Sequence, residues 1–405
     1  MLSKYPALGF PLYRRYWLAS LASVGGWQIS AVAMGWLVFE LSGSTLDLGI
    51  LGAATALPAI VMTFAGGVIA DRFEKRWVLI ITTLLNALLL LILALLAWLK
   101  IVDVWHVWLI AGGISVISGV DWPTRQSFFP HLIDRNALLS AVALNSVLWQ
   151  ATRMIVPAFG GLLLAVYDPS LVFVLAALGY LVMLVVISRI DVSLPGEAHE
   201  SPLQQIRIGL KFIAGHAFFR NLILLSYLTM LFLSSYMQLM PAFADLLGAG
   251  PTGFGILMSA TGLGSILGTI LSGSLSPGEN YGRVMLGGAI TAAFLLMAFA
   301  LASLSGSYPL ALLFALLAAT GTSMFLILST TALQAEVPDA LRGRVMGIHG
   351  ITYSLMPLGA LLTGAIANVI STPLALIATL SLYLLLVGWI IANNANLRRL
   401  TAPQA

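Results

Sequence analysis

The sequence concentrates charge in one short stretch, GGVIADRFEKR at residues 66–76, which separates two long apolar runs. The charged residues of this stretch are Asp71, Arg72, Glu74, Lys75 and Arg76. A carboxylate here can bind the free N–H groups at the start of a neighbouring helix, and the basic groups can form ion pairs with acids on other helices. Contacts of this kind can form in one conformation and break in another, so the stretch has the chemistry of a reversible charge network.

The composition of the chain indicates whether it lies in water or in a membrane. Of 405 residues, 60% are hydrophobic and 8% are charged, whereas a soluble domain is about half apolar and about a quarter charged. Such a chain suits a lipid bilayer, and we expect a multi-pass membrane protein. The net charge of +4 comes from basic residues scattered between apolar runs, so we expect no nucleic acid partner. The sequence has no cysteine, which excludes disulfides, thiolate metal sites and cysteine nucleophiles.

Twelve stretches are long and apolar enough to cross the bilayer, since a helix needs about 20 residues to span a hydrocarbon core about 30 Å thick. Lipid-exposed backbone must satisfy its own hydrogen bonds, so we predict an all-α membrane protein with twelve transmembrane helices. The predicted spans are 16–39, 48–70, 77–99, 106–127, 138–165, 171–190, 219–245, 252–275, 283–303, 308–332, 345–369 and 374–396.

The distribution of lysine and arginine predicts the orientation, because these residues favour cytoplasmic loops. With the N-terminus in the cytoplasm, seventeen of the nineteen basic residues lie on the cytoplasmic side. The exceptions are Lys100, in an outer loop, and Arg153, inside a predicted span. We therefore predict that both termini are cytoplasmic.

The longest polar interval divides the predicted spans into six and six. It predicts an N-terminal six-helix bundle at 1–190, a cytoplasmic linker at 191–218 and a C-terminal six-helix bundle at 219–405. The second part of the linker has the pattern of an amphipathic interfacial helix. The apolar residues on one face of this helix are Leu203, Ile206, Leu210 and Ile213.

The two halves also share a weak repeat. GILGAATAL at 49–57 and GILMSATGL at 255–263 are 206 residues apart, and the same offset pairs Gly67 with Gly273. Two parallel repeats of six helices are typical of transporters whose halves rock against each other. The alternative is that lipid-facing helices merely have similar compositions.

The sequence shows no constellation typical of an enzyme. It has neither a His-Glu-x-x-His motif nor a Gly-x-x-x-x-Gly-Lys-Ser/Thr phosphate loop. His106 and His349 have no metal-ligating neighbours in the sequence and are expected at the membrane interface. We predict no catalytic residues, no metal and no cofactor.

The pattern Gly67-x-x-x-Asp71-Arg72-x-Glu74-Lys75-Arg76 resembles the cytoplasmic signature of the major facilitator superfamily. That signature reads Gly-x-x-x-Asp-Arg/Lys-x-Gly-Arg/Lys-Arg/Lys between spans 2 and 3. An acid in place of its second glycine is familiar in the enterobactin-exporter-like and macrolide-efflux-like branch. Three further stretches, at 121–138, 239–257 and 333–347, also resemble that branch.

The resemblance implies a secondary transporter with the major facilitator fold. It implies an exporter of an amphiphilic small molecule, a drug or a siderophore-like compound, that works by alternating access as a proton antiporter. An importer, or a lipid or lysolipid flippase of the same fold, is the alternative. We expect a monomer in the bacterial inner membrane, with a small molecule and protons as its partners.

The resemblance also implies that the charged stretch closes a cytoplasmic gate. Asp71 can approach the N-terminus of span 11, and Arg72 or Arg76 can pair with an acid at the end of span 4. That acid, Asp121, has Arg125 as its i, i+4 neighbour. The alternative is a topological anchor that only holds the turn inside. The predicted gate residues are Gly67, Asp71, Arg72, Arg76, Asp121 and Arg125.

In span 5, Pro157, Gly160 and Gly161 resemble part of an antiporter signature, although Val156 replaces its usual glycine. Proline and glycine give a kink and a smooth face that a neighbouring helix can approach closely. We predict a hinge, with ordinary small-residue packing as the alternative.

Arg153 is expected to lie too deep in span 5 to reach the membrane surface, because it is about 22 Å along the helix from the cytoplasmic end. Such a cation binds an anionic substrate, takes part in coupling, or forms a structural ion pair. Other predicted cavity residues, for which helix packing is the alternative, are Trp27, Gln28, Gln150, Tyr236, Gln238 and Tyr353. The acids that could carry a proton at outer span ends are expected to be solvated, so no buried carboxylate is predicted.

Overall fold

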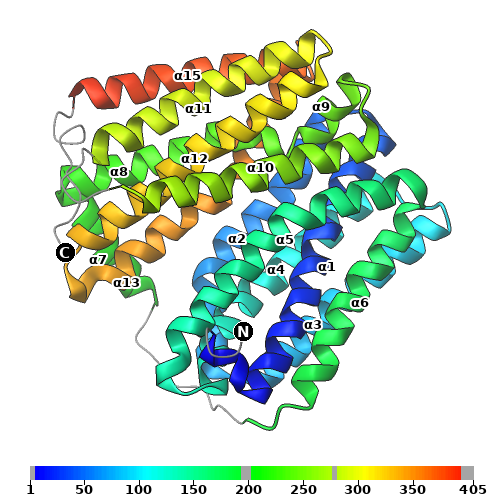
Figure 1. Ribbon diagram of the computed structural model, residues 1–405, viewed down its shortest axis with the longest axis vertical. Coiled ribbons are helices and arrows are strands. Elements are labelled where there is room, and N and C mark those ends of the chain that lie inside the picture. The colour runs from blue at the N-terminus through cyan, green and yellow to red at the C-terminus, as the bar shows by residue number, and fades with distance from the viewer. Residues whose placement is uncertain (1–4, 193–201, 276–280, 394–405) are drawn as a thin grey trace. The chain divides into compact units, whose positions relative to one another are not determined.

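The computed structural model describes residues 5–192, 202–275 and 281–393. Within these ranges, the side chains of a few helix residues, including that of Asp71, lie outside the description. All regular elements in the described ranges are helices (Figure 1). Contacts divide the chain into unit 1, residues 1–42 and 57–199, and unit 2, residues 43–56 and 200–405.

Twelve segments of the described chain are long and apolar enough to cross a membrane, which confirms the twelve predicted spans. The first six helices are α1 (Pro11–Ser42), α2 (Thr45–Arg72), α3 (Lys75–Trp98), α4 (Val104–Phe128), α5 (Leu138–Val166) and α6 (Pro169–Ser188). The others are α7 (Pro202–Gly215), α8 (Ala217–Leu228), α9 (Met240–Leu246), α10 (Gly250–Gly273), α11 (Tyr281–Leu304), α12 (Tyr308–Glu336), α13 (Asp339–Gly350), α14 (Met356–Ala367) and α15 (Thr372–Asn393).

In unit 1, α1 packs against α5 and α6, and α3 packs against α4 and α6. Glycines bring α1 and α6 into backbone contact, since a Cβ added at Gly26 would lie 2.5 Å from the backbone oxygen of Ala176. Small residues at such crossings are typical of membrane helices, where close approach increases van der Waals contact. The α1–α6 crossing therefore tolerates no larger side chain at this position.

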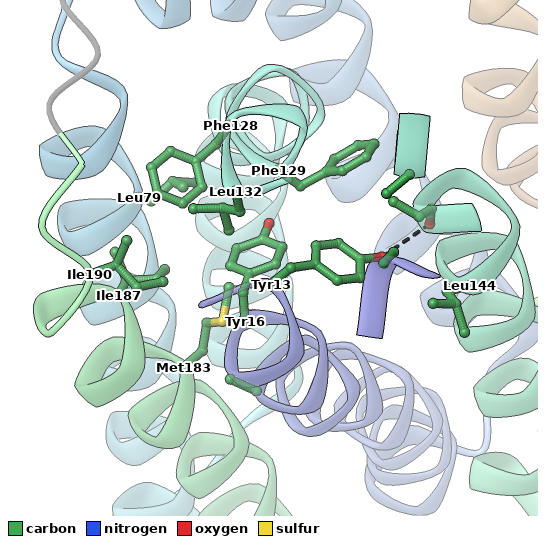
Figure 2. Packing of buried hydrophobic residues seen from close by; sticks show 14 residues of the cluster. Tyr13, Tyr16, Leu79, Phe128, Phe129, Leu132, Leu144, Met183, Ile187 and Ile190 are labelled. Atoms are coloured by element: carbon green, nitrogen blue, oxygen red, sulfur yellow. Dashed lines mark hydrogen bonds between the residues drawn. The ribbon is translucent and has the colours of Figure 1, made fainter. Parts of the chain in front are cut away.

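An apolar cluster holds together the end of unit 1 at which α1 begins (Figure 2). Tyr13 and Tyr16 of α1 contribute their rings, and Phe128 packs at 5.8 Å from the ring of Tyr16. The buried hydroxyl of Tyr13 donates a hydrogen bond of 3.0 Å to the backbone oxygen of Ala141 on α5. The cluster thus fixes the start of α1 against α4 and α5, the helices that carry the candidate site.

Two predicted spans of unit 2 are interrupted helices. The span predicted at 219–245 consists of α8, a π-helical turn at Thr229–Leu233, a 3-10 turn at Ser235–Met237 and the short helix α9. Similarly, α13 and α14 are joined by a 3-10 segment in the span predicted at 345–369. Prolines occur in the first turns of α9 and α14, where the missing N–H is tolerated.

Residues 43–56, the first part of α2, pack within unit 2 against α14. Thr45 donates from Oγ1 to the backbone oxygen of Gly364 at 3.2 Å. Added Cβ atoms at Gly49 and Gly52 would lie 2.7 Å and 2.9 Å from the α14 backbone. Glycines of the predicted repeat therefore permit a close helix–helix contact here, whereas the bundle boundary near residue 190 stays a prediction.

The predicted linker contains the helix α7, which packs against α13, and its amphipathic role at the membrane interface stays a prediction. Gly209 and Ile213 are buried, and an added Cβ at Gly209 would lie 3.2 Å from the backbone oxygen of Arg344. Leu210 of the predicted apolar face is 52% exposed. The side chains of Leu203 and Ile206, the other predicted residues of that face, lie outside the description.

Candidate functional site

A buried ion pair lies on α4 inside unit 1. Arg125 donates from Nε to the carboxylate of Asp121 one helical turn earlier, and the two side chains are 11% and 12% exposed. The other carboxylate oxygen accepts a hydrogen bond of 2.7 Å from Thr82 on α3, and Arg125 donates from Nη1 to Ser23 on α1 at 3.2 Å. The predicted i, i+4 pairing is confirmed, and side chains from three helices form one polar network.

Burial makes this network energetically important. A charge in a membrane-spanning segment is costly unless a second charge and hydrogen bonds compensate it. Asp121 is the only acidic side chain that is buried among those the structure describes, and both of its carboxylate oxygens accept hydrogen bonds. The expectation of no buried carboxylate is therefore wrong, because a local cation and a threonine make burial of this one tolerable.

Arg76 of the charged stretch does not join the network of Asp121 but contacts residues at the end of α6. From the first turn of α3 it donates from Nη2 to the backbone oxygen of Ser188 at 2.8 Å and lies 3.5 Å from the carboxylate of Asp191. It contacts the end of α6 rather than Asp121, the predicted partner, whose two oxygens are already bonded on α3 and α4. Arg72 is exposed at the end of α2.

The two glycines that open the charged stretch differ in their surroundings. An added Cβ at Gly66 would collide with the backbone of Gly119 on α4, whereas one at Gly67 would meet no atom within 4 Å. Gly66 is thus a packing glycine of the α2–α4 crossing, but Gly67 is not packed in this structure. The gating roles of Gly67 and Asp71 stay predictions, and the side chain of Asp71 lies outside the description.

The predicted hinge residues lie in a continuous α5. Pro157, Gly160 and Gly161 are buried, and α5 is helical from Leu138 to Val166. A Cβ added at Gly160 would lie 3.0 Å from Ile29 of α1, which is tighter than ordinary contact. The smooth face for close helix approach is confirmed at Gly160, while hinge motion stays a prediction.

Three tryptophans from three helices form a cluster beside the ion pair. The ring of Trp149 on α5 meets Trp27 of α1 at a centroid distance of 5.7 Å and Trp122 of α4 at 5.1 Å, both edge to face. Trp27 was predicted to line a cavity, whereas Trp122 and Trp149 were missed. The sequence feature that could have indicated them is their spacing. Trp122 lies about one helical turn before Arg125, and Trp149 lies one turn before Arg153.

A small cavity lies among these side chains, wholly within unit 1. It offers 30 Å³ of space to the centre of a water molecule. Asn145 and Gln126 line it and approach each other at 3.5 Å, from the Nδ2 of the first to the Oε1 of the second. The lining residues are Tyr16, Ser20 and Val24 of α1, Trp122, Arg125, Gln126 and Phe129 of α4 and the turn after it, and Asn145 and Trp149 of α5.

The other predicted residues of unit 1 do not line this cavity. Asn145, Trp149 and Arg153 follow each other at intervals of four on α5, which places them on one face. Arg153 is exposed, and Gln28 and Gln150 are partly exposed. Arg153 therefore shares the helix face of a cavity residue, one turn further along the predicted path through the membrane.

The residues predicted in unit 2 do not form a comparable group. Tyr236 is only 3% exposed and packs its ring 5.8 Å from Phe299. Gln238 is partly buried, and Tyr353 is 59% exposed on the 3-10 segment before α14. Tyr236 was predicted to face a cavity, but its side chain is buried in the packing between helices, which was the alternative.

His349 is buried, which corrects its expected place at the membrane interface. It is 3% exposed, with Nδ1 3.1 Å from the hydroxyl of Thr352 and Nε2 3.4 Å from that of Thr330. Its partners are hydroxyl groups, and no group of side chains suited to a metal ion occurs in the described ranges. The imidazole thus joins α12 to the interrupted span formed by α13 and α14.

Solved transporter structures share this fold over nearly the whole chain. A bacterial homologue of the human lysosomal transporter Spinster, in an inward-facing and unoccupied conformation, matches with a TM-score of 0.75 and 14% identity, covering 97% of this chain and 98% of that one. A D-xylose–proton symporter matches with a TM-score of 0.69 and 14% identity, covering 96% and 99% of the two chains. At this identity the matches show the fold, which is that of major facilitator transporters.

A family model shows the family, and sequence relatives agree with it. The enterobactin exporter EntS of Escherichia coli O1:K1 / APEC is 27% identical over 386 residues, which cover 93% of this chain and 90% of the relative. EntS of Shigella boydii serotype 18 is 26% identical over 383 residues, with the same coverage. A family model described as a transmembrane secretion effector matches residues 2–405. The chain belongs to this family of the major facilitator superfamily and is a secondary membrane transporter rather than an enzyme.

Proposed function

We propose that this protein exports an amphiphilic small molecule by alternating access. The observation that carries the proposal is the Asp121–Arg125 pair beside the tryptophans of α1, α4 and α5, inside segments that can span a membrane. Aromatic rings suit the apolar body of an amphiphile, and a buried charge network suits its polar group. The family description and the relatives named as enterobactin exporters support the outward direction.

Proton antiport is part of the proposal. The sequence has no phosphate-binding loop for ATP, so an ion gradient is the available energy source. We assign substrate binding and coupling to Arg153, the cation one turn beyond Trp149, and keep Asp121 among the proposed gate residues, whose charge network coupling must open and close. We further propose a monomer in the inner membrane, with six-helix bundles at 1–190 and 219–405 and both termini in the cytoplasm.

A growth test in a bacterial strain that lacks its own exporters checks this function. Expression of the full chain should raise tolerance to toxic amphiphiles, because export lowers their cytoplasmic concentration. The Arg153→Gln variant should lose this protection at an equal amount of protein in the membrane. A panel of amphiphiles for which expression gives no added tolerance and no lower cellular content would contradict export.

A further inference from the structure

We propose that the small cavity of unit 1 binds the acid group of an aromatic anion, whose ring then packs on Trp122 and Trp27. The inference names the substrate class for the site and rests on the proposed function. Its basis is the combination of one cation, neutral hydrogen-bond donors and two indole rings around a small cavity, with a third indole, that of Trp27, against the ring of Trp149.

The charge of the lining selects an anion. Arg125 is the one charged residue among the side chains that line the cavity, and the other polar lining groups are neutral. A guanidinium has five N–H donors, and in this structure the acceptors for those of Arg125 are Asp121, Ser23 and the hydroxyl of Tyr16. The amide groups of Asn145 and Gln126 add further donors. A carboxylate therefore finds several N–H groups here, while Asp121, the acid that pairs with Arg125, is not among the lining residues.

The size of the cavity limits what can enter it. Water centres have about 30 Å³ of room in the cavity, so it admits a small polar group such as a carboxylate. We place the ring of the ligand outside it, on the surfaces next to the cavity.

Those surfaces are aromatic and accessible. Trp122 and Trp27 are 45% and 37% exposed, and both meet Trp149 edge to face. A planar ring can add to this cluster by stacking or by an edge-to-face contact, which an aliphatic chain of equal area does not provide. Indole faces also attract cations, but the guanidinium of Arg125 opposes a cationic head group at this site.

Equilibrium binding to the full-length protein in lipid nanodiscs tests the inference, with tritiated 2-naphthoate as the probe. We expect saturable binding, with 2-naphthylmethanol, 2-naphthylmethylammonium and cyclohexanecarboxylate each competing at least about tenfold more weakly, since each lacks either the acid or the ring. Chloride at the same concentration should not compete. Displacement by the cation or the neutral alcohol at equal potency would overturn the proposal, and so would equal displacement by chloride.

Variants localise the binding. Trp122→Leu should weaken 2-naphthoate binding several-fold, and the double variant Asp121→Asn/Arg125→Gln, which removes both charges and leaves no buried ion unpaired, should abolish it. Trp105→Leu is the matched control, because Trp105 stacks on His106 at the other end of α4. Unchanged binding in the double variant would overturn the proposal. Absence of 2-naphthoate binding in a chain that still exports amphiphiles would refute this inference alone, whereas binding without any export would refute the proposed function alone.

Discussion

Arg125 and Asp121 form an ion pair across one turn of α4, with side chains that are only 11% and 12% exposed. Thr82 on α3 and Ser23 on α1 complete the hydrogen bonds of this pair. Two charges in a membrane-spanning segment are thereby compensated within unit 1. The same guanidinium lines a cavity bordered by tryptophans, so one residue joins the packing of unit 1 to its candidate binding site.

The first prediction concerns stability. Arg125→Gln leaves the carboxylate of Asp121 buried without its cation, which should lower the stability of the folded chain by about 3–5 kcal/mol. Thermal unfolding of the purified protein in nanodiscs measures this effect. The double variant Asp121→Asn/Arg125→Gln should recover most of the loss, since no uncompensated charge remains. A double variant that is as unstable as the single variant would contradict this explanation.

The second prediction separates packing from gating at two adjacent glycines. Gly66→Val should destabilise the protein, because the added atoms collide with the backbone of Gly119. Gly67→Val should leave the unfolding temperature nearly unchanged, because the Cβ position is open. If Gly67 belongs to a gate, its variant should lose transport at normal stability. Normal transport by the Gly67 variant would remove this residue from the gate.

Membrane spans could be predicted from sequence because length and hydropathy are local properties. The interruptions at Thr229–Leu233 and Ile351–Leu355 were not predicted, since helical hydropathy continues through them. Likewise, the exposure of Leu210 and the burial of His349 depend on which helix packs beside each of them. The sequence pattern of one helix does not contain that information.

The candidate site could be predicted only in part, because spacing within one helix is visible in the sequence and packing between helices is not. The pairing of Asp121 with Arg125 follows from spacing on one helix and was predicted. Convergence of Trp27, Trp122 and Trp149 requires the packing of three helices, so only Trp27 was identified. For Arg76 the prediction named the wrong partner: a likeness to a family signature indicated Asp121, whereas the acceptors in the structure are the last residue of α6, Ser188, and Asp191 beyond it.

A third prediction concerns the proposed gate. Asp71→Asn removes the carboxylate that we expect at the N-terminus of a helix in the other half, so the closed cytoplasmic gate should be less stable. Transport should fall, and reagents applied from the cytoplasmic side should label cavity residues faster. Asp134→Asn is the control, because Asp134 is an exposed acid between α4 and α5, in a segment that is also predicted to be cytoplasmic. Normal transport with unchanged labelling would contradict a gate and show that the charged stretch only holds the turn in the cytoplasm.

The fourth prediction addresses Arg153. Replacement by glutamine should abolish transport while membrane insertion stays normal, because a neutral side chain cannot bind an anion or take part in charge coupling. Arg135→Gln, in the exposed turn before α5, is the matched control and should transport normally. A transporting Arg153→Gln variant would show that this cation has no part in substrate binding or coupling.

Transport by inside-out membrane vesicles that contain the full chain tests export most directly. With an imposed pH gradient, acid inside, the vesicles should accumulate a labelled amphiphile, and collapse of the gradient should abolish the accumulation. Vesicles with the Asp71→Asn or Arg153→Gln variant, at equal protein content, should accumulate less. Accumulation that does not depend on the gradient would contradict proton antiport, and accumulation only in right-side-out vesicles would contradict export.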